Sequence, residues 1–296
     1  MALRKLESTS RHLQYDDLDP YARVRVEKAD PEGTVLLDSP HSGSFYPSEF
    51  EHACSRALLR STEDALVHEL FAEGPRLGAT LIHALFARSF IDVNRSTEDL
   101  DAELVEGTSA PSSEKALVGI GLIWRHINGV PIYSRQLTQE EVRHRVAMYW
   151  RPYRETLNSA WDSIVDRHGF GVHLNCHSMP SRDFLYQGPF QGVMPYDFIV
   201  GNRGGTTASK RLTQLVVDHL RSRGWKVAVN LLFSGADIVK CMGAPVSGRH
   251  SVQLEINRAL YLEESSGERL PSFFQLKDEM TELVRRLLLL RGSADL

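Results

Sequence analysis

The amino-acid sequence predicts an α/β fold: a single domain with a mixed, mostly parallel sheet and helices on both faces. Short apolar runs rich in β-branched residues alternate with longer amphipathic stretches, the pattern of helices packed on a largely buried sheet. No internal repeat or low-complexity linker divides the chain. Its 296 residues, 42% hydrophobic and 24% charged, suffice for one large core. We therefore expect one domain over residues 1–296, with its core at about 30–292.

The apolar and β-branched runs predict six strands, at 34–39, 79–85, 171–176, 197–201, 226–232 and 251–256. Helical periodicity predicts helices at 48–60, 64–72, 138–167, 207–221 and 273–290. Thr138 and Glu141 match the T-x-x-E capping box of a helix start. Pro152 is expected to kink or divide the helix that begins there, and Gly224 to end a helix before a strand. The acidic, Ser- and Pro-rich segment 96–118 predicts a long surface loop, a candidate flap over the site.

Charge and hydropathy favour a soluble cytoplasmic protein. The net charge is −4 and the basic residues form no block, so neither nucleic acid nor an anionic membrane is an expected partner. The first twenty residues are polar, without the apolar segment of a signal peptide, and the run LVRRLLLLRG is too short to span a bilayer. Cys54, Cys176 and Cys241 form no C-x-x-C pair and are expected to be reduced thiols. The oligomeric state does not follow from the sequence.

Three chemically distinctive side chains lie at or near the ends of predicted strands. His41 and His177 each follow an apolar strand, and Glu255 lies within another. Ligands of open α/β sheets bind outside the carboxyl ends of the strands. A hydrolytic zinc site needs neutral imidazoles and a carboxylate as ligands, and a further carboxylate to move protons. The spacing is long and no H-E-x-x-H is present, so each histidine could instead hydrogen-bond the turn in which it stands.

Other features have simpler interpretations. A cysteine hydrolase using Cys176 or Cys241 is an alternative. Cys176 stands beside His177, but adjacent strand residues point to opposite faces, which argues against that pair. His173 is expected to be a packed strand histidine. The loop GNRGG at 201–205 is similar to a phosphate-binding loop but lacks its Lys-Ser/Thr ending.

Five strings in order carry a resemblance to a known family: SPHSG followed by Tyr-Pro, then DVNR, CHSMP, DFIVGNRGGT and QLEINRALYL. Together they resemble the N-formylglutamate amidohydrolase family, over roughly residues 30–265. That family is similar in fold and site to the zinc carboxypeptidases and aspartoacylase. The resemblance therefore implies a zinc-carboxypeptidase-like (phosphorylase/hydrolase-like) fold and one Zn²⁺ per chain.

The resemblance also implies the metal ligands. It places zinc between His41 and His177. The segment STEDALVHELF matches a family segment in which an aspartate precedes a helix, which implies Asp64 as third ligand, with Glu63 as the alternative. A carboxylate suits the borderline character of zinc.

Further roles come from the same resemblance. Asn94 and Arg95 are implied to bind the substrate carboxylate, and Arg95 to stabilise charge on the substrate as a catalytic residue. The alternative for Arg95 is a structural ion pair with Asp92. Glu255 is implied to be the general base toward water and then to protonate the leaving amine; its apolar sequence neighbours are expected to raise its pKa. Arg203 is a further candidate substrate contact.

The chain departs from the family pattern at three positions. Cys241 stands where a histidine is expected, Ala244 replaces an arginine before Pro245, and Asn202 stands where an aspartate is common. The expected function is metal-dependent hydrolysis of the amide bond of N-formyl-L-glutamate or a related N-acyl amino acid. The alternative is a metal-binding member of the same fold that is not catalytic or has an altered substrate.

Overall fold

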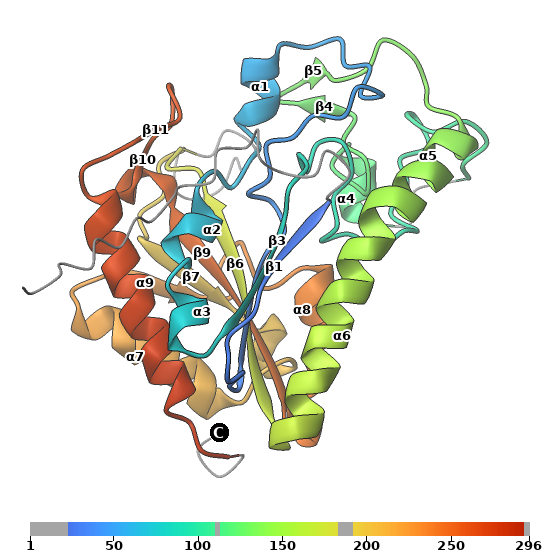
Figure 1. Cartoon of the computed structure of the whole chain (residues 1–296). Helices are drawn as coiled ribbons and strands as arrows, with labels where there is room; N and C mark the ends of the chain where they lie inside the picture. The colour runs from blue at the N-terminus through green and yellow to red at the C-terminus, as the bar shows by residue number, and fades with distance from the viewer. Residues whose placement is uncertain (1–22, 110–112, 183–191, 293–296) are drawn as a thin grey trace, which may run out of the picture.

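A seven-stranded sheet runs through the molecule in the computed structural model, which describes residues 23–109, 113–182 and 192–292 (Figure 1). In spatial order the strands are β1 (Val24–Glu27), β3 (Thr80–Ala84), β2 (Val35–Ser39), β6 (Gly171–Met179), β9 (Arg249–Asn257), β7 (Phe198–Gly201) and β8 (Val227–Val229). The four strands from β3 to β9 are parallel, whereas β1 and β7 are antiparallel to β3 and β9. The predicted α/β fold with a mixed, mostly parallel sheet is confirmed.

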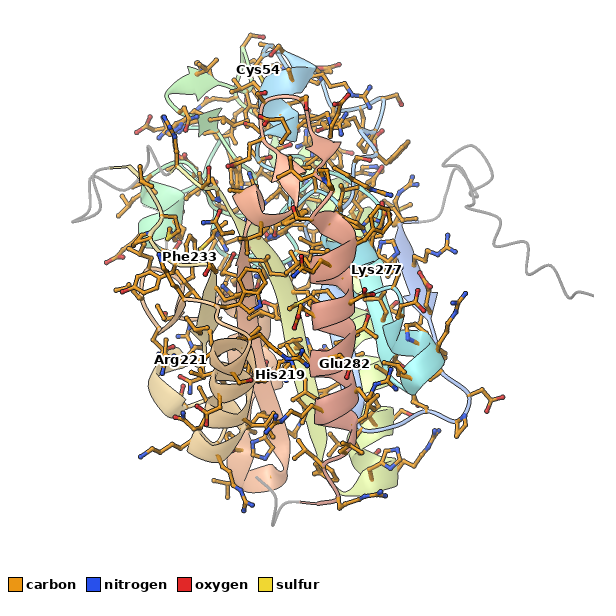
Figure 2. All side chains as sticks on the ribbon, turned by 90° about the vertical axis from the view of Figure 1, so that its left-hand side faces the viewer. Cys54, His219, Arg221, Phe233, Lys277 and Glu282 are labelled. Atoms are coloured by element: carbon orange, nitrogen blue, oxygen red, sulfur yellow. The ribbon has the colours of Figure 1, made fainter. Side chains whose placement is uncertain are left out.

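Helices cover both faces of this sheet, as predicted. One layer contains α7 (Lys210–Ser222) and α9 (Phe273–Leu288) with the short α2 (Val67–Leu70) and α3 (Gly74–Leu77), and Figure 2 views the molecule from this side. The other layer contains α6 (Arg151–His168) and α8 (Asp237–Met242). Gly224 ends the turn after α7 with a φ of 90°, which confirms it as a helix stop. Among the described residues, no helix is both long and apolar enough to cross a membrane.

The long helix predicted at 138–167 is one continuous helical run with a local irregularity. It comprises α5 (Gln139–Arg145), a π-helical turn at Val146–Trp150, and α6. The capping box is present, because Thr138 Oγ1 accepts from the Glu141 backbone and the Glu141 carboxylate accepts from the Thr138 backbone. The irregular turn lies just before Pro152, which lacks the N–H that a regular helix would use there.

Two predicted helices are much shorter than the periodicity indicated. Of 48–60 only α1 (Arg56–Arg60) is helical, because the Ala53 N–H pairs with the carbonyl of Ile132 and Ser55 supplies the cap. Of 64–72 only α2 is helical, since Leu66 has a left-handed φ of 64°. Tertiary contacts therefore override local periodicity here.

Smaller elements went unpredicted. They are β1, α3, α4 (Glu114–Leu117), α8 and the hairpins β4 (His126–Ile127) with β5 (Val130–Pro131) and β10 (Leu262–Glu263) with β11 (Glu268–Arg269). Because β1 pairs with β3, the sheet begins before residue 30. Segment 96–118, predicted as a surface loop, contains α4 and buries Leu104 and Val105, so its described part is anchored in the core.

The two central strands present opposite chemistry on their two faces. Val172, Leu174 and Cys176 of β6 and their neighbours Val252, Leu254 and Ile256 of β9 pack into the core beneath α7 and α9. The alternate residues form two paired polar rows on the face toward α6 and α8: His173, Asn175 and His177 beside Ser251, Gln253 and Glu255. All six are buried, and these rows lead to the carboxyl ends of the strands.

Candidate metal centre and active site

A cavity of about 930 Å³ opens at the carboxyl ends of the parallel strands. Six of the predicted site residues line it: His41, Asn94, Arg95, His177, Arg203 and Glu255. Asp64 lies in the wall behind this lining and is fully buried. The site therefore lies where the strand topology predicts.

The turn S-P-H-S-G places His41 at the end of β2. The hydroxyl oxygens of Ser39 and Ser42 are 2.8 Å apart and brace the turn. A Cβ on Gly43 would stand 2.4 Å from the backbone carbon of Leu85, so only glycine lets this turn pack against the end of β3. The backbone N–H of Asp64 donates to the carbonyl of His41 at 2.9 Å, which ties the two candidate ligands together.

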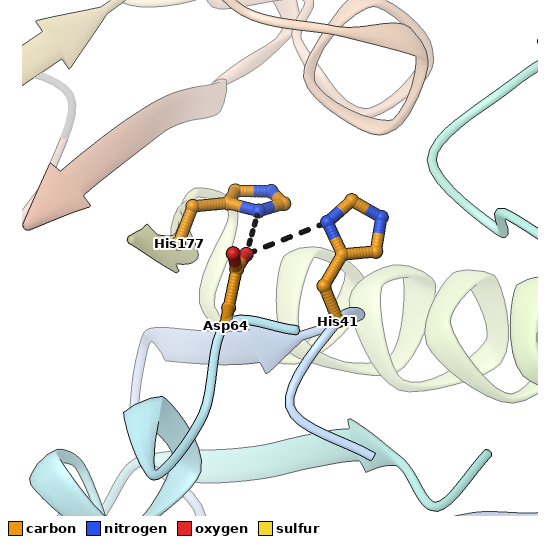
Figure 3. A group of neighbouring side chains, drawn as sticks. All are labelled: His41, Asp64 and His177. Carbon is orange, nitrogen blue, oxygen red and sulfur yellow. Dashed lines mark hydrogen bonds and ion pairs between the residues drawn. The ribbon is translucent and has the colours of Figure 1, made fainter. Parts of the chain in front are cut away.

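Two imidazole nitrogens and one carboxylate oxygen converge at the base of the cavity (Figure 3). His177 Nδ1 lies 2.8 Å from Asp64 Oδ2, and His41 Nδ1 lies 3.4 Å from the same oxygen. The candidate ligand atoms of His41, Asp64 and His177 all lie within 4.8 Å of one another. Among the described residues, no other group of three or more His, Cys, Asp or Glu side chains lies close enough to hold a metal ion.

In each histidine ring, Nε2 points away from Asp64, and its hydrogen-bond partner indicates whether Nδ1 carries a proton or a lone pair. His41 Nε2 lies 2.6 Å from Asp92 Oδ1, and His177 Nε2 lies 2.8 Å from Asn175 Oδ1. Both partners can accept a hydrogen bond, and in the tautomer that carries the proton on Nε2 each Nδ1 is left as an acceptor. No described group donates a hydrogen bond to His41 Nδ1.

Three acceptor atoms facing one another in a buried site repel one another, and a cation bound between them would satisfy all three. Two neutral imidazoles and a carboxylate are the donor set of a zinc site, and a carboxylate or amide behind each ring is its usual support. These residues therefore fit a metal ion such as zinc.

Electrostatics keep the carboxylates of this site ionised. Burial alone would raise the pKa of Asp64, but its contacts with His177 and His41 and the charge of Arg88 hold it well below its usual value. Burial opposes ionisation of Asp92 as well, yet the neighbouring His41 and Arg88 keep its pKa well below the usual range. Burial lowers the pKa of His177, which favours the neutral ring that a metal needs.

Glu63, the alternative third ligand, faces a different set of groups. Its carboxylate accepts a short hydrogen bond from the Tyr46 hydroxyl, and it lies 3.7 Å from Arg60 Nε. Only Asp64 belongs to the converging group, so the structure favours Asp64 over Glu63.

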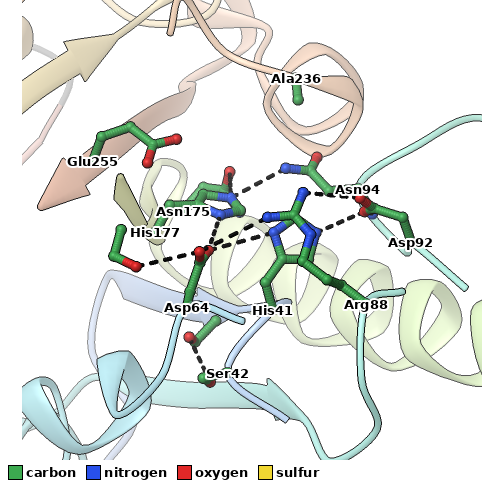
Figure 4. Close-up of polar contacts among 12 residues, drawn as sticks. His41, Ser42, Asp64, Arg88, Asp92, Asn94, Asn175, His177, Ala236 and Glu255 are labelled. Atoms are coloured by element: carbon green, nitrogen blue, oxygen red, sulfur yellow. Dashed lines mark hydrogen bonds and ion pairs between the residues drawn. The ribbon is translucent and has the colours of Figure 1, made fainter. Parts of the chain in front are cut away.

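Glu255 faces the cavity from β9, beside His177 on the neighbouring strand (Figure 4). Burial, and then the negative charge of Asp64, raise its pKa well above the usual value. The expected rise is present, but its causes are burial and Asp64, because the apolar sequence neighbours Leu254 and Ile256 face the other side of the sheet. Gln253 holds the carboxylate: its Nε2 donates to Glu255 Oε1 at 2.7 Å, while its Oε1 accepts from Ala236 N at 3.1 Å.

The three predicted substrate-binding side chains are held in different ways. Arg95 donates to the carbonyls of Ile120 and Asn94, and no described carboxylate lies within ion-pair distance of it, so the alternative pair with Asp92 is not formed. Asn94 Oδ1 accepts from Ile238 N at 2.9 Å. Arg203 is exposed at the cavity rim and donates to the carbonyl of Gly235.

Sequence reasoning missed Arg88 and the supporting role of Asp92. Arg88 donates to Asp92 Oδ2 at 2.9 Å, lies 3.8 Å from Asp64 Oδ1 and packs over the ring of Trp124. Asp92 accepts from both Arg88 and His41. The D-V-N-R string contained Asp92, but nothing in the spacing marked Arg88.

The two remaining sequence alternatives lack support in the structure. Cys176 is fully buried on the apolar face of β6, donates to the carbonyl of Leu174, and its pKa is raised by burial and by Asp38. Cys241 is exposed and does not line the cavity. In the GNRGG loop, Asn202 accepts from Gly205 N at 2.9 Å, so this N–H is already used within the loop.

Comparisons with known proteins agree with this geometry. The family model described as N-formylglutamate amidohydrolase matches residues 33–262. A solved structure titled as N-formylglutamate amidohydrolase from Ralstonia eutropha JMP134 is 38% identical, with a TM-score of 0.85 over 90% of this chain and 97% of that one. The N-formylglutamate deformylase of Pseudomonas putida is 26% identical over 78% of this chain and 82% of its own length.

More remote matches extend the same pattern. The N-formylglutamate deformylase of Pseudomonas aeruginosa is 24% identical over 78% of this chain and 83% of its own length. A structure from Agrobacterium tumefaciens, gene product Atu2144, shares the fold with a TM-score of 0.64 at 16% identity, over 90% of this chain and 93% of that one. The family match covers well over half of the chain, so this protein belongs to the N-formylglutamate amidohydrolase family.

Proposed function

We propose that this protein is a zinc-dependent amidohydrolase that releases formate from N-formyl-L-glutamate, or the acyl group from a closely related N-acyl amino acid. The observation that carries the proposal is the convergence of three buried acceptor atoms, from His41, Asp64 and His177, beside the buried carboxyl of Glu255. The names of the relatives support the formylated substrate.

His41, Asp64 and His177 would hold the single zinc ion of the chain. When bound, zinc lowers the pKa of water and polarises the substrate carbonyl. Asp92 and Asn175 hold the rings of His41 and His177 from behind, so the two Nδ1 atoms stay directed toward Asp64.

Glu255 is the proton carrier of the reaction. Its carboxylate takes a proton from the attacking water and then returns it to the nitrogen of the leaving amino acid. A carboxyl with a raised pKa suits both steps, because it binds the proton and also releases it. Gln253 directs one carboxylate oxygen by its hydrogen bond, leaving the other to face the reaction.

The charge of the cavity wall favours an anionic substrate. Basic side chains outnumber acidic ones among the lining residues: Arg60, Arg88, Arg95, Lys115, Arg182, Arg203, Lys240 and Arg258 against Glu63, Asp99, Asp237, Glu255 and Glu264. Arg95 has no carboxylate partner among the described residues and can pair with a substrate carboxylate, with Asn94 and Arg203 as further contacts. Arg88, next to Asp64, suits the negative charge that develops on the carbonyl oxygen.

The three departures from the family pattern lend the non-catalytic alternative no support. Neither Cys241 nor Ala244 lines the cavity. Asn202 is buried, and its side chain forms hydrogen bonds with Thr213 and Asn230. His41, Asp64, His177 and Glu255, the residues proposed for metal binding and proton transfer, are unaffected by these departures. We therefore expect catalysis, with a substrate pocket that these three positions do not form directly.

A substrate panel tests the proposal. Purified enzyme is assayed for release of free amino acid from N-formyl-L-glutamate, N-formyl-L-glutamine and N-acetyl-L-glutamate. We expect the formylated, doubly anionic substrate to have the highest kcat/KM, because the cavity wall is basic. Folded, zinc-loaded protein that hydrolyses none of the three would contradict the proposed reaction.

A further inference from the structure

A buried hydrogen-bonded network runs from the middle of the sheet to His177 (Figure 4 shows its end at Asn175 and His177). Asp38 of β2 lies beside Asn175 of β6 in the parallel pairing of these strands. The Asn175 Nδ2 lies 2.8 Å from Asp38 Oδ1, and the His173 Nε2 lies 2.8 Å from the same oxygen. Tyr153 donates to the other oxygen, and none of these side chains lines the cavity.

The directions of these bonds follow from Asp38. Burial alone would raise the pKa of Asp38, but the charge and hydrogen bond of His173 and the hydrogen bond of Asn175 lower it. An ionised carboxylate only accepts, so Asn175 must turn its NH₂ group to Asp38 and its oxygen to His177. His177 then has to donate from Nε2.

A competing arrangement exists at the same nitrogen. The Nδ2 of Asn94 lies 3.1 Å from His177 Nε2 and would donate to it if that nitrogen were unprotonated. The Asn175 oxygen would then face a lone pair at 2.8 Å, with its amide unable to turn because of Asp38. The shorter contact and the fixed amide favour the proton on Nε2.

We infer that Asp38 and Asn175 are positioning residues that fix the proton of His177 on Nε2 and so present Nδ1 to the metal. The inference rests on the proposed metal site. It means that metal affinity depends on a carboxylate that lies in the sheet, wholly outside the cavity. Outer partners of metal-binding histidines typically change metal affinity by about 10–100-fold when they are removed.

The network offers a test with an internal control. Asn175→Leu keeps the approximate volume but removes the acceptor for His177 Nε2. Ser251→Ala is the control. The Ser251 hydroxyl lies 2.8 Å from His173 Nδ1, whereas Asp38 contacts the other ring nitrogen, so this change alters the network without a direct contact to His177. Both variants alter the same buried network, but only Asn175→Leu removes a hydrogen-bond partner of the proposed metal ligand His177.

Zinc affinity is the first measurement, made on the full chain by competition with a chromophoric chelator. We expect Asn175→Leu to bind zinc about 10–100-fold more weakly than the wild type, and Ser251→Ala to stay within about two-fold. Equal affinity in all three proteins, or an equal loss in both variants, would overturn the inference. A wild-type chain that binds no zinc would overturn both the inference and the metal part of the proposed function.

The protonated nitrogen can also be observed directly, without relying on the folding of a variant. Long-range ¹H–¹⁵N NMR of metal-free wild-type protein with labelled histidine distinguishes the two ring tautomers. We expect the signal of His177 to show the proton on Nε2. A proton on Nδ1 would assign the contact with Asn94 as the real hydrogen bond and overturn the inference.

Discussion

At the residue scale, the site is defined by the direction of a few hydrogen bonds. The rings of His41 and His177 each donate outward, to Asp92 and Asn175, and accept inward. The inward atoms share one neighbour, Asp64, whose own pKa is held low by these two histidines and by Arg88. A buried centre of this kind is poised for a cation, and the chemistry depends on the carboxyl placed beside it.

Glu255 is expected to be essential for turnover but not for metal binding. Glu255→Gln keeps the shape and the contact with Gln253 but cannot accept a proton from water, so kcat should fall by about 10²–10⁴-fold. Zinc content, measured on the same preparation, should equal that of the wild type. Turnover close to wild type would show that another group moves the proton. Glu268→Gln, an exposed change on β11, serves as the control and should be neutral.

Arg95 is expected to bind the carboxylate of the substrate. Arg95→Ala removes a guanidinium that has only backbone partners among the described residues, so kcat/KM for N-formyl-L-glutamate should fall by about 10–100-fold. The matched control is Arg143→Ala, an exposed arginine of α5 outside the cavity, which should leave kcat/KM unchanged. An unchanged value for Arg95→Ala would exclude the anchoring role.

At the element scale, the loops after the strands place the ligands, and some of them tolerate little change. Gly43→Ala would put a Cβ 2.4–2.6 Å from backbone atoms of Leu85 and Phe86. Backbone cannot yield as a side chain does, so we expect a loss of at least about 1–3 kcal/mol in unfolding free energy and weaker zinc binding through the displaced His41. Chemical denaturation measures the first and chelator competition the second. Gly292→Ala has open space around it and should be neutral.

The helix start at α5 gives a second prediction at this scale. Thr138→Ala removes the side-chain half of the capping box, so the free energy of unfolding should fall by about 1 kcal/mol, without effect on KM. Urea denaturation with an unchanged m-value would measure this. Ser159→Ala, exposed in the middle of α6, removes no cap and should not destabilise. A loss as large in this control would mean that capping is not the cause.

The sequence predicted the elements whose pattern is independent of distant partners. In the central strands β6 and β9 apolar residues alternate with polar ones, and the box at Thr138 is a local signal, so both could be predicted. The short α1 and α2 could not be found, because their limits depend on Ile132, which pairs with Ala53, and on the left-handed Leu66. β1 was not predicted because its apolar and charged residues alternate over only four positions, too few to stand out as a strand.

Within the site, too, the residues that could be predicted are those with a local sequence signal, and the residues that were missed depend on contacts made in the folded chain. His41, His177 and Glu255 could be chosen because reactive residue types stand at strand ends, and the resemblance supplied Asp64 and Arg95. Arg88 could not, since its importance comes from lying between Asp64 and Asp92, a contact that only the folded chain makes. Asn175 was not predicted as a site residue either. Its role comes from the hydrogen bond with Asp38, which lies far from it in the sequence.

At the scale of the whole molecule, the metal should stabilise the fold. In its absence, the acceptors of His41, Asp64 and His177 face one another inside a buried site, which opposes folding. Zinc at about 100 times its Kd should add about 2.7 kcal/mol to the free energy of unfolding and raise Tm by several degrees. Thermal unfolding of chelator-treated protein, with and without zinc, measures the effect.

Two variants identify the third ligand in the same experiment. Asp64→Asn should lose most of the zinc-dependent rise in Tm, whereas Glu63→Gln should keep it, because Glu63 faces Tyr46 and Arg60. The reverse result would assign the metal to Glu63.

The central claim is that this chain hydrolyses N-formyl-L-glutamate at a zinc site. The most direct test follows formate release by purified enzyme as isolated, after chelator treatment, and after zinc is returned. We predict activity that is lost with the chelator and restored by zinc. Formate release that persists in verified zinc-free protein, or its absence from protein that holds zinc stoichiometrically, would contradict the account.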